Sequence, residues 1–137
     1  MVVSATHPRI AVICVVLGML VLSLPVSAHH GTNISYDHDK PVTLNGTVTE
    51  FIFSNPHAQL YFDVKDARGN VLHWGGELNS PFNLKRDGWT KTTFKPGDQI
   101  RLTVFPAKTG APVGVVDRSK AIAVNGKELP GGRGGVD

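Results

Sequence analysis

From residue 42 onward, short segments of alternating hydrophobic and polar residues are separated by turns rich in glycine, proline and asparagine. A period of two is typical of β-strands that bury one face. The pattern predicts five extended segments: 42–53, 59–64, 71–78, 99–106 and 121–129. Within the last segment, the Asn125-Gly126 pair favours a tight hairpin turn. The intervening stretch 107–120, which contains Gly110, Pro112 and Gly114, is expected to be a loop.

The first predicted strand, Val42–Phe53, is long and changes phase along its length. Val42, Leu44, Val48 and Ile52 stand at even-numbered positions, which share one face of a regular strand. Phe51 and Phe53 stand at odd-numbered positions and would lie on the other face. We expect a β-bulge or coil near residues 49–50, because one extra residue brings both halves onto the same face. The long first strand of a small barrel needs such a bend.

A short helix is predicted between the third and fourth strands. Ser80 is a good N-cap and Pro81 suits the first helical position, so the helix should run to about Arg86 and end at Gly88. Three strands, one helix and further strands are the order of an OB-fold. The expected class is all-β with small α content, an OB-fold-like five-stranded Greek-key barrel with one short helix between strands 3 and 4. A β-sandwich is the alternative, but it does not need the helix at that place.

The first 28 residues have the pattern of a cleaved secretory signal. Residues 10–24 are continuously apolar and too short to span a membrane comfortably, and Val26-Ser27-Ala28 offers the small residues that signal peptidase recognises. An uncleaved membrane anchor is the alternative. We therefore expect a periplasmic or secreted protein with no stable membrane insertion after cleavage. The expected parts are a signal peptide (1–28), an N-terminal arm (29–40), the barrel (41–129) and a disordered tail (130–137).

Composition limits the chemistry that remains after cleavage. The one cysteine, Cys14, lies inside the signal, so neither a disulfide nor a thiolate ligand is expected in the mature chain. The formal net charge of the whole chain is +3, and losing Arg9 with the signal lowers it by one. This charge is small and evenly scattered, which argues against nucleic acid as a partner.

Several motifs together resemble a known family. They are "AHHG" at the mature start, "DKPVTLNGTVTEF", "NPHAQLYFDVKD", "GELNSPFNLKRDGW" and "FKPGD". The chain is similar to a family of small exported bacterial proteins whose domain has no assigned function. The resemblance covers residues 39–108 well and the amino terminus moderately. It implies an exported small β-barrel and supplies location and fold more than chemistry.

Histidines are the candidate metal ligands. If cleavage leaves His29 first, its free amine and ring can chelate one metal, and a third nitrogen from His57 completes a T-shaped set that Cu(II) accepts. His30 and His38 are alternate ligands. The competing interpretations are a solvated His29-His30 start, a His57 that caps strand-end carbonyls, and a His38 that is a solvated loop residue.

A second candidate site lies around two tryptophans. Trp74, Glu77, Arg86 and Trp89 could surround a shallow pocket for a small organic ligand, together with nearby asparagines. Alternatively, both tryptophans belong to the core and Glu77 forms a structural pair with Arg86. His73 is expected to point away from the face that carries Trp74.

No pattern in the sequence predicts an enzyme. The chain lacks a nucleophile context, a phosphate-binding glycine loop and a close carboxylate pair. The leading hypothesis is an exported β-barrel that binds copper through its mature N-terminal histidine, and a copper-dependent oxidase ranks well behind it. The alternative is an OB-fold module that binds a non-metal small ligand or a protein.

Overall fold

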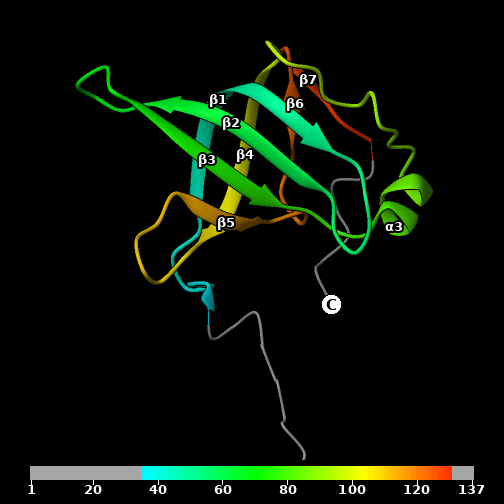
Figure 1. The fold of residues 1–137 in the computed structure, drawn as a ribbon, viewed down its shortest axis with the longest axis horizontal. Helices are drawn as coiled ribbons and strands as arrows, with labels where there is room; N and C mark the ends of the chain where they lie inside the picture. The colour runs from blue at the N-terminus through cyan, green and yellow to red at the C-terminus, as the bar shows by residue number, and fades with distance from the viewer. Residues whose placement is uncertain (1–34, 131–137) are drawn as a thin grey trace, which may run out of the picture. The chain divides into compact units, whose positions relative to one another are not determined.

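The structure, a computed structural model, describes residues 35–130, which contain seven strands and one helix (Figure 1). The elements are β1 (Val42–Ile52), β2 (Gln59–Lys65), β3 (Val71–Glu77), α3 (Pro81–Arg86), β4 (Gln99–Pro106), β5 (Val113–Val116), β6 (Ala123–Val124) and β7 (Lys127–Glu128). Among residues 35–130, no helix is both long and apolar enough to cross a membrane. The predicted signal peptide and all but the first residue of the predicted tail lie outside the described residues.

Five of the strands form a closed barrel. The order is β1-β2-β3-β5-β4, and β4 pairs with β1 to close the ring. β3 and β5 run parallel, whereas the other neighbouring strands of the ring are antiparallel. The helix stands between the third and fourth strands in the chain, at one end of the barrel (Figure 1). This confirms the predicted OB-fold-like architecture.

The bulge predicted in the first strand is present. The β1–β2 register shifts between Val48 and Glu50, so Thr49 is the extra residue. Before the shift Val48 is buried, and after it Phe51 packs against the core while Ile52 is 37% exposed. The extra residue lets β1 bend and pair with β2 at one end and with β4 at the other.

Alternating residues of the strands fill the barrel, as the period of two predicted. In β2 Leu60 and Phe62 are buried, and in β4 every second residue from Ile100 to Val104 is buried. The core cluster consists of Val48, Ala58, Leu60, Phe62, Leu78, Leu84, Trp89, Phe94, Ile100, Leu102, Val104, Val116 and Ile122. Burial of this apolar surface is the main stabilising contribution to the fold.

The prediction for 107–120 was wrong, because residues 113–116 form β5, the fifth strand of the barrel. The predicted strand 121–129 supplies only the β6–β7 hairpin, which joins the sheet beside β4. Val115 and Val116 are adjacent and both buried, so both faces of β5 are covered. A strand buried on both faces lacks the alternation by which the other strands were recognised. At Gly114 a Cβ would lie 2.6 Å from the Phe105 carbonyl oxygen, so this close approach of β4 and β5 requires glycine.

The helix and its caps follow the prediction. The Ser80 side chain accepts a hydrogen bond from the Asn83 N–H, Pro81 is the first helical residue, and α3 ends at Arg86. Gly88 has a φ of +85°, which a residue with a side chain rarely adopts. The chain then turns so that Trp89 enters the core.

Trp89 connects the loop after α3 to Pro130, the last described residue. Its ring is buried, and its Nε1–H donates to the Pro130 carbonyl oxygen at 2.9 Å. The buried guanidinium of Arg118 lies 5.5 Å from the centre of the same ring and pairs with Asp87. Trp89 therefore holds the segments on both sides of β4 together.

Candidate functional site

A histidine–carboxylate pair lies at the end of the β2–β3 hairpin. Ala58 is buried, its N–H donates to the Asn79 carbonyl, and its carbonyl accepts from the Leu78 N–H. These bonds continue the β2–β3 pairing beyond the strands and bring His57 beside Glu77. The loop that leads to His57 includes a cis peptide bond between Asn55 and Pro56.

The His57 ring is held by one nitrogen. Its Nδ1 hydrogen-bonds to Glu77 Oε1, and 46% of the histidine side chain is exposed. Because a carboxylate accepts hydrogen bonds, Nδ1 is the donor in this contact. Nε2 has no hydrogen-bond partner among residues 35–130. The pair therefore fixes the orientation of an imidazole whose second nitrogen is available as a ligand.

Tyr36 connects the N-terminal arm to the same carboxylate. Its hydroxyl donates to Glu77 Oε2 at 3.5 Å. Burial raises the pKa of Tyr36 above its ordinary value of 10.0, and the negative charge of Glu77 raises it further. The arm is also attached through its backbone, since Asp37 N–H donates to the Pro106 carbonyl and Lys108 N–H to the Ser35 carbonyl. The first described residues thus lie against the end of β4, beside Glu77.

His38, an alternate ligand in the sequence analysis, has a different environment from His57. Its ring stacks on Phe105 with 4.4 Å between ring centroids. His29 and His30 lie outside the described residues. Within residues 35–130 no three histidine, cysteine, aspartate or glutamate side chains are grouped closely enough to hold a metal. A metal at His57 would therefore need ligands from outside this range.

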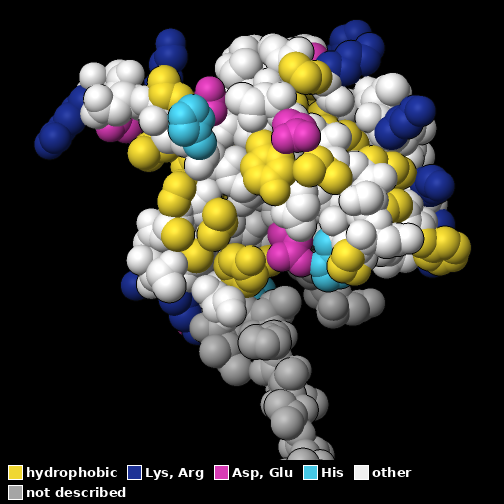
Figure 2. Space-filling model, in the orientation of Figure 1, with side chains coloured by type: hydrophobic (Ala, Val, Ile, Leu, Met, Phe, Trp, Pro, Cys, Tyr) yellow, Lys and Arg dark blue, Asp and Glu magenta, His cyan; other side chains and the backbone are white. Residues whose placement is uncertain are grey.

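A second histidine–carboxylate pair lies further along the same hairpin. His73 and Asp63 face each other across β2 and β3, with 2.6 Å between Nδ1 and Oδ1. The His73 side chain is 82% exposed, as its predicted direction away from the Trp74 face implies. On the face of the molecule that Figure 2 shows, histidine side chains lie beside acidic side chains at two separate places. The chain thus contains an internal control for any role of the His57–Glu77 pair.

The residues of the predicted tryptophan pocket are not arranged around one cavity. Trp74 and Glu77 are three residues apart on β3 and therefore point to opposite faces, with Trp74 packed against the core. Arg86 is exposed in the last turn of α3, and Trp89 is buried. Glu77 pairs with His57, not with Arg86.

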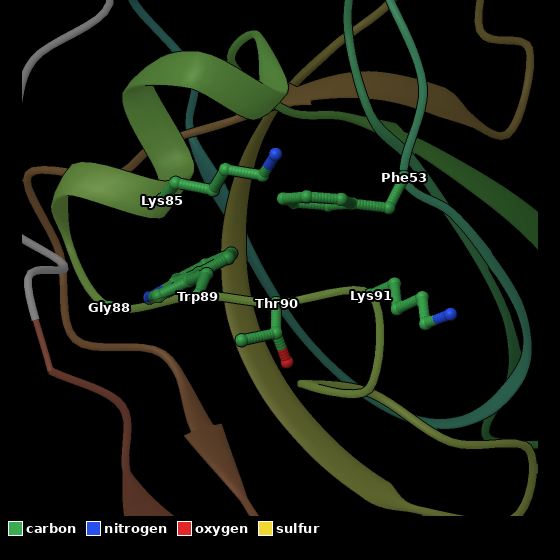
Figure 3. A pocket seen from close by; sticks show the side chains of 6 residues that line it. All are labelled: Phe53, Lys85, Gly88, Trp89, Thr90 and Lys91. Atoms are coloured by element: carbon green, nitrogen blue, oxygen red, sulfur yellow. The ribbon is translucent and has the colours of Figure 1, made fainter.

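A cavity of about 510 Å³ lies beside Trp89 (Figure 3). It is lined by Phe53, Lys85, Gly88, Trp89, Thr90 and Lys91. Of these residues, only Trp89 was predicted from the sequence to belong to a site. Phe53 was recognised as a core-facing residue, and nothing in its own segment indicated that the α3–β4 loop would lie opposite it.

Neither the role of Tyr36 nor the proximity of His57 to Glu77 was predicted from the sequence. The two members of this pair are 20 residues apart, and Tyr36 is 41 residues from Glu77. Their contacts depend on the β2–β3 register and on the backbone bonds of the arm, neither of which has a local sequence signal.

One family model matches the chain, over residues 16–127, and it describes a family of unknown function (DUF6152). The matched range includes all of β1 to β6 and both members of the His57–Glu77 pair. No curated protein and no solved structure matches the chain.

Proposed function

The chain belongs to this family of unknown function, and from that premise we propose that it is an exported protein that binds Cu(II) between His57 and its mature amino terminus. The proposal combines the described His57–Glu77 pair with the expectation that cleavage after Ala28 leaves His29 first. The barrel serves as a rigid support for one ligand, and the arm carries the others.

The observation that carries the proposal is the hydrogen bond from His57 Nδ1 to Glu77. Histidines that ligate metals almost always donate their other ring N–H to a carboxylate, carbonyl or water, which fixes the tautomer and raises the basicity of the ligating nitrogen. His57 has this arrangement, and its side chain is about half exposed. Such a partly exposed ring at a barrel end can accept a ligand that approaches from solvent.

The position of the arm supports His29 as the partner. The Tyr36 hydroxyl contacts Glu77, so the backbone of the arm at Tyr36 is no further from Glu77 than the length of a tyrosine side chain. His29 precedes Tyr36 by seven residues, which span at most roughly 24 Å when fully extended. The amino terminus therefore has enough chain to return to His57.

The available donors favour Cu(II). In this proposal the His29 amine, the His29 ring and His57 Nε2 form the T-shaped set of three nitrogens, with His30 and His38 as alternates. Nitrogen ligands suit Cu(II), which also forms the most stable complexes among the divalent first-row metals. The only cysteine would leave with the signal peptide, so thiolate ligands do not compete.

A titration with a matched control tests the proposal. The chain from His29 to Asp137 is titrated with Cu(II) against a chelator of known affinity, alongside His57→Ala and His73→Ala. We expect His57→Ala to weaken binding by more than about tenfold, because a ligand is lost. His73→Ala removes the more exposed of the two carboxylate-paired histidines, 82% against 46% for His57, and should leave the affinity within about twofold, since its ring is not a ligand in the proposed site. Equal effects of the two substitutions would contradict the proposal.

A further inference from the structure

We propose that the cavity beside Trp89 is a second binding site, which takes a small organic carboxylate with an apolar body. None of the cavity-lining residues belongs to the proposed copper site. The two proposals are therefore independent, and this one requires no metal.

The walls of the cavity are apolar. Phe53 follows the end of β1, and Trp89 comes from the loop after α3, so two distant segments face each other across the space (Figure 3). Trp89 is 1% exposed and held by its bond to Pro130, so it forms a rigid base beneath the cavity, whereas Phe53 is only half-buried and offers the aromatic contact surface. A volume of about 510 Å³ lies within the range of small-molecule sites.

The charge at the cavity is positive and uncompensated. Lys85 extends its ammonium group toward the edge of the Phe53 ring. Lys91 lines the opposite side of the cavity, and its side chain points outward (Figure 3). Neither lysine forms an ion pair with any residue in 35–130, and no carboxylate lines the cavity. The nearby Asp87 is already paired with Arg118. An anionic group is thus the complement that the cavity lacks.

Two further features fit an amphipathic occupant. Phe82 is 70% exposed and lies one helical turn before Lys85 on the same side of α3, so apolar surface continues beyond the cavity. Gly88 places no side chain at the cavity wall, and its positive φ disfavours one. A carboxylate at Lys85 with an alkyl or aryl body against Phe53 and over Gly88 matches both the charge and the apolar lining.

The test uses octanoate as the probe, with the chain from His29 to Asp137, which contains the whole barrel, in the presence of EDTA. Calorimetry measures affinity, and amide NMR shifts locate the ligand. We expect saturable octanoate binding with a Kd of about 1 mM or tighter, with the largest shifts at Gly88, Thr90 and Lys91. Octylammonium should not bind at this site, and 1-octanol should bind about three- to fivefold more weakly than octanoate because it lacks the charge.

Two surface variants and one variant of the aromatic wall complete the test. Lys85→Gln should weaken octanoate binding about three- to fivefold and leave 1-octanol binding unchanged, whereas Lys127→Gln, on the exposed strand β7, should change neither. Phe53→Leu should weaken both ligands by removing the aromatic wall. The proposal is overturned if octanoate fails to saturate at roughly ten times the expected Kd. It is equally overturned if shifts lie elsewhere, or if Lys85→Gln behaves like Lys127→Gln.

Discussion

Replacing Glu77 by glutamine isolates the role of its charge in orienting His57. The glutamine side chain has nearly the same shape, and its carbonyl oxygen can still accept from Nδ1, but the negative charge is lost. In the proposed site Glu77 does not touch the metal. It is a positioning residue, which holds the His57 tautomer and strengthens Nε2 as a ligand.

The exposure of the pair sets the expected magnitude. Loss of such a partner typically costs 10- to 100-fold in metal affinity. The side chains of His57 and Glu77 are 46% and 27% exposed, so water screens their interaction. We therefore expect Glu77→Gln to lie at the lower end of this 10- to 100-fold range. Cu(II) should bind about tenfold more weakly, which is a loss of about 1.4 kcal/mol in binding free energy.

The assay combines competitive Cu(II) titration with long-range ¹H–¹⁵N NMR of the histidine rings. In the metal-free protein, His57 should carry its proton on Nδ1, and Glu77→Gln should raise the population with the proton on Nε2. The matched control is Asp63→Asn, which removes the same charge from His73 and should leave Cu(II) affinity within about twofold. Unchanged affinity and tautomer in Glu77→Gln, or an equal loss in Asp63→Asn, would refute the reasoning.

Three further predictions concern the fold and the arm. Gly114→Ala should lower the free energy of unfolding in urea by about 1–3 kcal/mol, since its Cβ would lie 2.6 Å from a β4 carbonyl oxygen. Gly75→Ala, whose Cβ would have ordinary 3.5 Å contacts, should stay within about 0.5 kcal/mol, and equal losses would contradict the close approach of β4 and β5 at Gly114. In ultraviolet titration, Tyr36 should ionise above pH 10.0 and at lower pH in Glu77→Gln, because a neighbouring negative charge disfavours the phenolate; an unchanged titration would argue against that contact. Ser80→Ala should cost about 1 kcal/mol in the same urea experiment through loss of the N-cap, and no change would contradict the cap.

The features that the sequence predicted are those with local causes. The bulge after Val48 follows from a change of parity within one strand, and the helix from Ser80 and Pro81 at its start. Strand β5 has no such signal, because it is four residues long, contains Gly114 and is buried on both faces. Its place between β3 and β4 depends on pairing with strands far away in the chain.

The candidate site was predictable only in its individual residues. His57 could be selected from its position after Pro56, between two strands. Its pairing with Glu77 depends on the β2–β3 register and on the backbone hydrogen bonds of Ala58. The contact between Tyr36 and Glu77 depends on the attachment of the arm to β4. The cavity beside Trp89 likewise joins segments that the sequence keeps apart.

The most direct test of the copper proposal concerns the mature amino terminus. The protein is expressed from its full sequence, the first residue of the product is identified by mass spectrometry, and that chain and its His29→Ala variant are then titrated with Cu(II). We predict a chain that begins at His29, and a loss of affinity in His29→Ala of more than about tenfold because the first ring ligand is removed. A different first residue, or Cu(II) binding that His29→Ala leaves unchanged, would contradict the proposed site.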